Sequence, residues 1–244
     1  NNVMQHNTSN KDLAAYSTDS SIFKVVPSHV YYPECVQDIQ EIVRHATQEQ
    51  KNISVQAGAT CMTGGSLTTG IMLDLKKYMH KIQILPYSSS ANVEMGAYYR
   101  DIESAMLPHN LMFAPYTSSK DVCGIGGMIG NNASGEKSVR YGGTVDNVHA
   151  VTVVLHDGTL HTFEEISEKE CAARAKEKTT VGYIYKNIRD IYQTYGHGYA
   201  YGVGSVRKAS SGYRLEKIYN QSEKTWNLSK LFIGCNAGVT MPSG

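Results

Sequence analysis

The sequence predicts a mixed α+β fold for this chain of 244 residues. Short apolar runs typical of strands are interleaved with segments whose apolar residues recur at helical spacing. Two glycine-rich, almost uncharged loops, residues 57–66 and 124–135, lie among these segments. A chain of this length can bury a substantial core, either as one large domain or as two lobes.

The first half of the chain is expected to alternate strands with two helices. Residues 1–21 are polar and rich in Ser, Asn and Thr, so we interpret them as an arm or linker. Pro33 opens a helix that runs to about Glu49, because apolar residues recur on one face. A second helix is expected from about Tyr99 to near Pro108. The extended segments are expected at 24–26, 30–32, 53–55, 71–73, 82–85 and 92–95.

The second half begins with a strong strand signal. Residues 148–155 form a β-branched run, and His156-Asp157-Gly158-Thr159 predicts a hairpin turn that leads to a strand at 160–163. The charged stretch 164–178 is expected to be helical and solvated. Residues 181–195 are expected to form another helix.

Composition excludes several classes of protein. The formal net charge of +1 gives no electrostatic footprint for nucleic acid or an acidic membrane. Apolar runs such as 151–155 are far too short to span a bilayer. The five cysteines are scattered without a C-x-x-C pair, which argues against a disulfide framework and a zinc or iron–sulfur site. The chain begins at Asn1 and stops at Gly244 without a terminating element, so we expect a fragment of a longer protein.

Both loops suit the binding of phosphate and a polar ring. Glycine lets backbone amides approach a phosphate closely, and small hydroxyls add donors without bulk. The first loop contains no lysine or arginine, so dipoles would neutralise a bound diphosphate. Either loop alone could be a tight packing turn, but two together favour the walls of one cofactor site. The side chains that could hydrogen-bond this cofactor are Thr60, Thr63, Ser66, Asn131, Asn132 and Ser134.

Neither loop matches a standard nucleotide motif. Thr63 stands where a Walker A motif beginning at Gly58 needs its second glycine, and no Gly-Lys-Ser/Thr follows. Ile129 stands where the third glycine of G-x-G-x-x-G is required. The lack of a phosphate-gripping lysine favours a cofactor that stays bound over a nucleoside triphosphate substrate.

Several segments share their pattern with one known family. They are residues 17–21, 57–66, 71–75, 115–119, 124–135 and 141–144, with weaker echoes at 210–213 and 231–234. On these segments the chain resembles the FAD-linked 2-hydroxy-acid dehydrogenases, which include D-lactate dehydrogenase, the flavin subunit of glycolate oxidase and D-2-hydroxyglutarate dehydrogenase. This family belongs to the vanillyl-alcohol-oxidase superfamily. The resemblance implies a PCMH-type FAD-binding domain of two α+β lobes with FAD between them.

The resemblance also implies a division of the chain and a set of flavin contacts. After an arm at 1–21, lobe one would span about 22–81 and lobe two about 82–244, with the substrate cap domain absent. The first loop would cradle the diphosphate, the second loop and residues 115–119 would lie along the ring and ribityl chain, and one backbone contact would reach the adenine. These residues are Gln56, Ala57, Gly58, Ala59, Thr60, Cys61, Met62, Gly64, Gly65, Pro115, Thr117, Ser118, Ser119, Gly126, Gly127, Asn131, Ala133, Ser134, Gly135 and Val153.

The chain departs from the family pattern at three places. Gln56 replaces the usual Arg before the first loop, and Ala57 replaces its first Gly. A late glycine-rich flavin contact with an acidic residue corresponds here to Gly234-Cys235-Asn236-Ala237-Gly238. The first loop has no histidine, so we expect FAD to be bound without a covalent link.

The function that the resemblance implies is oxidation of a small D-2-hydroxy acid, with hydride transfer to flavin N5. Electrons would pass to a quinone, a cytochrome or an iron–sulfur partner. The protein would lie in the cytoplasm, or peripherally at the inner membrane. The family carries its substrate cap and histidine-rich metal site C-terminal to this domain. We therefore name no catalytic base and no metal ligand, and we expect these residues alone to be nearly inactive.

Other interpretations stay open. The chain could be a diverged or truncated flavin-binding module without catalysis, or an NADPH-using cell-wall precursor reductase of the same fold. Cys61 and Cys123 could be redox-active, although small-residue packing is the simpler interpretation. Arg140 could meet a substrate carboxylate or an FAD phosphate. The remaining candidates are the proton carriers His109, His149, His156 and His161, and the lysines Lys76 and Lys77, which we expect to be solvated.

Overall fold

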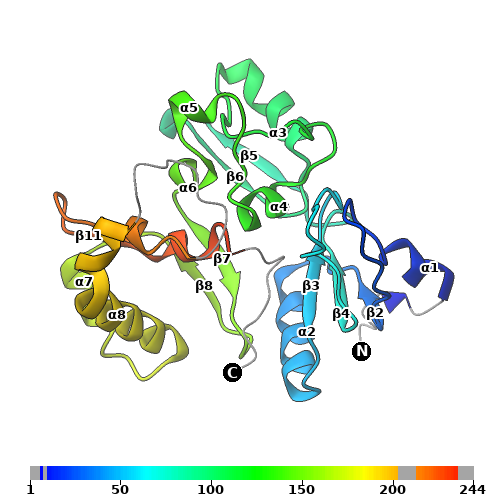
Figure 1. The fold of residues 1–244 in the computed structure, drawn as a ribbon, viewed down its shortest axis with the longest axis horizontal. Helices are drawn as coiled ribbons and strands as arrows, with labels where there is room; N and C mark the ends of the chain where they lie inside the picture. Colours follow the sequence, from blue (N-terminus) through cyan, green and yellow to red (C-terminus); the bar gives the residue numbers. More distant parts are fainter. Residues whose placement is uncertain (1–5, 8–9, 203–212, 236–244) are drawn as a thin grey trace.

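The computed structural model describes residues 6–7, 10–202 and 213–235. Its elements form three groups: a sheet with its helix, a mixed group around a hairpin, and a helical group with a small sheet (Figure 1). The predicted mixed α+β class is confirmed. In this part of the chain we find no helix with the length and apolarity needed to cross a membrane.

The first group is built on a four-stranded sheet. Its order is β1 (His6–Asn7), β2 (His29–Tyr31), β4 (Ile71–Asp74) and β3 (Ile53–Gln56). The strands β2, β4 and β3 are parallel, whereas β1 is antiparallel to β2. Every residue of β4 is buried, as expected for a central parallel strand. The predicted strands at 30–32, 53–55 and 71–73 are therefore confirmed to within a residue or two.

Two helices cover this sheet. The helix α2 (Val36–Gln48) connects β2 to β3 and turns its apolar stripe toward the sheet. Burying each apolar side chain of this stripe contributes roughly 1–3 kcal/mol to the stability of the fold. The helix α1 (Asn10–Ala15) lies in the region that we predicted as an arm, and Leu13 packs against Val30 and Met72. The buried residues of α2 are Ile42, Val43 and Ala46.

The second group contains the other glycine-rich loop. The hairpin of β5 (Ile82–Leu85) and β6 (Ser90–Val93) packs with α3 (Tyr99–Met106). Residues 125–130 of the loop form a helix, α4 (Ile125–Gly130), because Ile125, Met128 and Ile129 recur at helical spacing and bury one face. The remaining short elements here are η1 (Pro86–Ser88), η2 (Leu107–His109), α5 (Ser138–Tyr141) and α6 (Thr144–Asn147).

The third group lies at the other side of a second hairpin (Figure 1). This hairpin joins β7 (Val151–Val154) to β8 (Leu160–Phe163). The core of this third group contains Phe163, Tyr185 and Trp226. The other elements are β9 (Glu165–Ser167), α7 (Glu168–Arg174), α8 (Thr180–Gly202), η3 (Leu215–Lys217), β10 (Tyr219–Asn220), β11 (Thr225–Asn227) and η4 (Leu228–Phe232), with β10, β11 and β9 in one sheet.

Two expectations are corrected. The stretch 164–178 is not a solvated helix throughout: it begins with β9, whose Ile166 is buried and pairs with Trp226 of β11. The helix α7 then starts at its N-cap Ser167, whose hydroxyl accepts a hydrogen bond from the Glu170 amide at 3.2 Å. The segment 24–26 is not a strand and forms only an isolated bridge between Lys24 and Thr18.

The turn of the second hairpin ties the groups together. Gln40 donates a hydrogen bond from Nε2 to the carbonyl oxygen of Gly158 at 2.6 Å, and Thr47 Oγ1 donates to His156 O at 2.8 Å. Gly158 has φ +81°, and a β-carbon there would clash with Arg44. Glycine at this turn therefore allows the hairpin to dock on α2.

Candidate functional site

The two glycine-rich loops lie against each other. A β-carbon placed on Gly58 would lie 2.0 Å from the carbonyl oxygen of Val122, just before the second loop. A β-carbon on Gly124 would lie 2.8 Å from that of Ala57. Only residues without side-chain bulk allow this approach, so the glycines bring the two loops to one place.

The first loop presents a run of backbone donors. Within the described chain, we find no hydrogen-bond acceptor for the amides of five consecutive residues, Gly58 through Met62. Ala59 lies in the left-handed region with φ 54°, a conformation that non-glycine residues adopt at a cost of roughly 1–2 kcal/mol. Successive amides in such a loop form an anion-binding concavity.

Residues 18–20 support the first loop through hydrogen bonds. The amide and hydroxyl of Ser20 donate to Ala59 O at 3.0 and 3.1 Å, and Ser66 Oγ donates to Asp19 Oδ2 at 3.1 Å. Gln56 is buried and donates from Nε2 to Thr18 O at 3.4 Å. Residues 17–21 carry part of the family resemblance, but the sequence alone indicated no role for them. Their Ser, Thr and Asp side chains, which favour local turns, were the available signal.

The thiol of Cys61 belongs to the same loop. Burial opposes ionisation of this thiol, but hydrogen bonds from the Thr63 hydroxyl and from the amides of Thr63 and Gly65 outweigh it and lower the pKa. Burial instead raises the pKa of Cys123, which lies directly before the second loop. Cys61 is therefore the more reactive of the two thiols expected near a bound cofactor.

A third segment, residues 115–119, closes on the end of the second loop. A β-carbon on Gly135 would lie 1.8 Å from the carbonyl oxygen of Tyr116. Thr117 Oγ1 and Ser119 Oγ share a hydrogen bond of 2.8 Å. In the part of the chain that the structure covers, the amides of residues 117–119 and of Ser134 have no protein acceptor. The three segments thus offer several unused donors around one region.

Part of the second loop is occupied by structural contacts. Asn132 is buried, has φ 44°, and accepts a hydrogen bond at Oδ1 from the Val145 amide at 2.9 Å. Its side-chain oxygen therefore stabilises the fold, and its contact to a heterocycle stays a prediction. Thr144 Oγ1 donates to Ala133 O at 2.7 Å, and the amide of Gly234 donates to Ile129 O at 3.0 Å. Asn131 is exposed and Ser134 half-buried.

A cavity of about 290 Å³ opens beside the first loop. Lys76 reaches this cavity from the end of β4, and its Nζ donates to Ala57 O at 2.7 Å. Its side chain is only 19% exposed, so the expectation that Lys76 is solvated is wrong. The cavity is lined by Ala57, Gly58, Ala59, Lys76, Tyr98, Arg100 and Val122.

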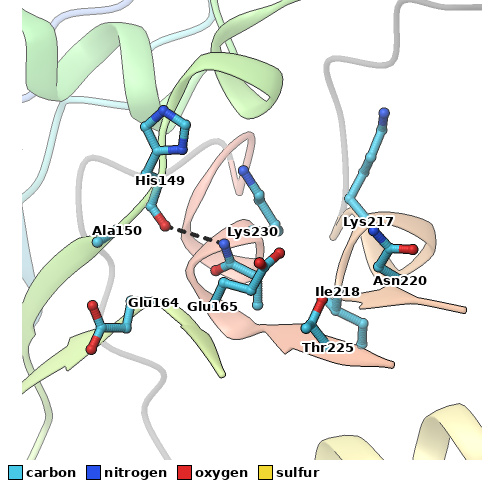
Figure 2. A pocket seen from close by; sticks show the side chains of 10 residues that line it. His149, Ala150, Glu164, Glu165, Lys217, Ile218, Asn220, Thr225 and Lys230 are labelled. Atoms are coloured by element: carbon cyan, nitrogen blue, oxygen red, sulfur yellow. Dashed lines mark hydrogen bonds between the residues drawn. The ribbon is translucent and has the colours of Figure 1, made fainter. Parts of the chain in front are cut away.

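A second cavity of about 390 Å³ lies elsewhere (Figure 2). Its lining combines His149, Glu164, Glu165, Lys217 and Lys230 with polar neighbours and includes no residue of either glycine-rich loop. Lys230 donates from Nζ to Val145 O at 2.7 Å and Val148 O at 2.6 Å, and burial lowers its pKa. The dashed bond in Figure 2 joins Asn227 Nδ2 to His149 O at 3.1 Å. These contacts hold η4 and β11 against the chain before β7.

Three further candidates belong to segments outside the two glycine-rich loops. Val153 is half-buried in β7 and packs with the core of the third group. Arg140 is exposed on α5 beside Tyr141. His161 lies 3.3 Å from Arg174 Nη1, and burial followed by the Arg174 charge lowers its pKa. Residues 210–212 of the weaker echo at 210–213, and residues 236–238 of the late glycine-rich segment, lie outside the described residues.

Comparisons with known proteins match this arrangement. A family model described as FAD binding domain matches residues 27–164. The chain is 28% identical over 231 residues to D-2-hydroxyglutarate dehydrogenase of Escherichia coli (strain K12), which covers 93% of this chain and 23% of that protein. It is 28% identical over 155 residues to glycolate oxidase subunit GlcD of the same strain, covering 62% of this chain and 31% of the relative.

A solved structure shares the fold. The structure of 6-hydroxy-D-nicotine oxidase from Arthrobacter nicotinovorans superposes with a TM-score of 0.60 at 23% sequence identity, over 66% of this chain and 36% of that one. The present chain therefore spans less than a third of the length of the curated relatives named above.

Proposed function

This chain belongs to the FAD binding domain family, and on that premise we propose that its two glycine-rich loops hold one molecule of FAD. The observation that carries the proposal is the run of five amides, Gly58 through Met62, that have no acceptor in the described chain and lie beside the second loop. A diphosphate supplies the acceptors that these donors lack. The residues present fit the cofactor.

Each segment has a distinct role in this proposal. Residues 56–65 hold the diphosphate, residues 115–119 and 126–135 lie along the ribityl chain and ring, and the Val153 backbone reaches the adenine. Ala133 and Gly135 contribute close packing rather than donors, since the Ala133 amide donates to Met128 O at 2.8 Å and the Gly135 amide to Ser138 Oγ at 3.0 Å. We further propose two lobes, about 22–81 and 82–244, with FAD between them. The binding is non-covalent, because the first loop contains no histidine.

We propose that the whole protein oxidises a D-2-hydroxy acid of the 2-hydroxyglutarate, glycolate or lactate class. Two relatives, a D-2-hydroxyglutarate dehydrogenase and a glycolate oxidase subunit, support this substrate class. When bound, FAD would supply the hydride acceptor for this oxidation. The residues of this chain bind and orient that group through backbone donors. We assign no catalytic base among them.

The electron acceptor and the location are further proposals. We propose that electrons pass to a quinone, a cytochrome or an iron–sulfur partner. One relative is named as a subunit, which supports a partner protein. We place the protein in the cytoplasm or peripherally at the inner membrane.

One pair of variants tests the flavin site. Thr60 is half-buried in the first loop, and its hydroxyl has no partner in the described chain. Thr60→Asp adds a negative charge where the diphosphate is proposed, and we expect the Kd for FAD to rise at least about tenfold. The Thr60→Asn variant, which is nearly isosteric with Thr60→Asp but uncharged, is the control and is expected to retain most of the affinity. Equal affinity in both variants contradicts this placement.

A second experiment tests the reaction. The full-length product of the gene, loaded with FAD, is mixed without oxygen with D-2-hydroxyglutarate, D-lactate or glycolate, and bleaching of the flavin is followed. We expect one of these acids to bleach it, and the L enantiomer of a chiral substrate to leave it oxidised. Bleaching by NADPH alone supports the reductase alternative. A flavin that none of them reduces supports a binding module without catalysis.

A further inference from the structure

Lys76 is fixed at the edge of the first loop. Its ammonium donates to Ala57 O at 2.7 Å and lies 3.2 Å from Asp74 Oδ2. Asp74 is itself buried, and Tyr16 OH donates to the same carboxylate oxygen at 2.9 Å while the Lys76 amide donates to Oδ1 at 2.8 Å. The carboxylate is thus fully engaged and holds Lys76 in place.

The Lys76 ammonium has one N–H donor beyond these two contacts, and its Nζ also lies over the Tyr16 ring, 5.8 Å from the ring centre. A lysine carries three N–H donors, and the two contacts above use two of them. Lys76 lines the cavity beside the loop. At 19% side-chain exposure it is shielded from water on most sides, which strengthens both its pairing with Asp74 and its attraction for a second anion.

Arg100 supplies a second cation to the same cavity. Its Nη1 donates to Asp121 O at 2.8 Å, and its guanidinium lies 4.7 Å from the centre of the Tyr98 ring. These contacts orient the guanidinium. The nearest carboxylate is that of Asp101, 3.8 Å from Nε and more than half exposed, so it screens Arg100 weakly.

The cavity is small for a ligand pocket. Its 290 Å³ lies just below the roughly 300–1,000 Å³ typical of ligand pockets, so it has room for part of a ligand. Three of its lining residues, Ala57, Gly58 and Ala59, belong to the first loop. The sequence has neutral Gln56 directly before that loop, so positive charge at this point comes from elsewhere in the fold.

We propose that Lys76 and Arg100 form an oxyanion-binding site beside the first loop, which takes either the diphosphate of FAD or the carboxylate of a hydroxy acid. Both ligands follow from the proposed function, on which this inference rests. A diphosphate would bridge the two cations and the loop amides. A carboxylate would pair with the same cations through its two oxygens.

The test measures binding of FAD and of riboflavin, which has the same ring but no diphosphate. If the site takes the diphosphate, Lys76→Met and Arg100→Gln each raise the Kd for FAD, by about tenfold and about threefold, and leave the Kd for riboflavin unchanged. Lys76→Arg restores most of the affinity. Lys186→Met, which removes an exposed lysine on α8, controls for net charge.

The other arm measures the hydroxy acid. If the site takes the carboxylate, the FAD affinity of the variants is normal, and the full-length protein needs about tenfold more hydroxy acid for half-maximal flavin reduction. Unfolding midpoints identify any variant that fails to fold. Because Arg100 is exposed, Arg100→Gln still decides the question if Lys76→Met is unstable.

The outcomes separate the two proposals. Variants that match the parent protein for FAD, riboflavin and hydroxy acid overturn the oxyanion site and leave the flavin site standing. A parent protein that binds neither FAD nor riboflavin overturns the proposed function and this inference with it.

Discussion

Gly58 lies so close to Val122 that a β-carbon on Gly58 would be 2.0 Å from the Val122 carbonyl oxygen. These residues are 64 positions apart and belong to different groups of elements. The contact joins the parallel sheet of the first group to the loop of the second. The absence of a side chain at Gly58 therefore allows the two proposed walls of the flavin site to meet.

Replacing Gly58 by alanine is expected to separate these walls. Because backbone atoms cannot move aside cheaply, we expect a loss of about 1–3 kcal/mol in the free energy of unfolding. Denaturant unfolding measures this loss. Gly143→Ala is the control, since its β-carbon would lie 3.5 Å from Asn132 Oδ1. Equal stability of the two variants contradicts the close packing of the loops.

Cys61 is expected to react faster than the buried thiols. Its pKa is lowered by hydrogen bonds from Thr63 and Gly65, so at pH 7 more of it is thiolate than in an ordinary cysteine. Burial raises the pKa of Cys171 to about 11. Brief treatment with iodoacetamide, followed by peptide mass spectrometry, should show modification of Cys61 well before Cys171, and added FAD should slow it. If Cys61 and Cys171 are labelled at the same rate, the hydrogen bonds from Thr63 and Gly65 do not activate the Cys61 thiol.

Asp146 is expected to make stability sensitive to acid. Burial opposes its ionisation, but the Lys217 ammonium at 2.9 Å and the Gly143 amide lower its pKa. A carboxyl group whose folded pKa is depressed contributes stability above its unfolded pKa, near 3.8, and loses it as the pH falls through the folded value.

Asp146→Asn should therefore cost stability at pH 7, by about 1 kcal/mol or less because the pair is partly exposed. This difference from the parent protein should shrink below pH 4. Unfolding at several pH values checks it, with Asp190→Asn on α8 as the control. A difference that stays constant down to pH 2 contradicts the assignment.

Phe163 is expected to anchor the third group. It is fully buried, and its ring centre lies 5.0 Å from that of Phe232 and 5.8 Å from that of Tyr185. Phe163→Ala should lower the free energy of unfolding by about 3–5 kcal/mol, and Phe163→Leu by clearly less. Thermal unfolding distinguishes the two. A small effect of the alanine variant means that this cluster is not a core.

Local sequence pattern predicted much of the fold. Strands β3, β4 and β8 and helix α2 follow from apolar runs and helical spacing, which act within a few residues. The strand β9 was missed because its pairing partner, β11, lies about sixty residues further on. The helix α1 was missed because its polar sequence gave little periodicity, and its one buried apolar residue, Leu13, depends on the sheet.

In the candidate site, too, local features were predictable from the sequence and contacts between distant segments were not. The glycine-rich loops were visible in composition, because close backbone approach requires glycine. The roles of Asn132 and Lys76 were not, because each depends on a partner in another segment: the Val145 amide and the Ala57 carbonyl. A lysine at a strand end predicts solvation unless a buried carboxylate such as Asp74 fixes it.

The most direct measurement is the flavin content of the purified chain after incubation with FAD and removal of free cofactor. We predict a yellow protein with close to one FAD per chain, all of which enters the filtrate when the protein is precipitated with acid. A well-folded chain that stays colourless would contradict the claim that the two loops hold one flavin. Colour that remains with the precipitate would contradict non-covalent binding.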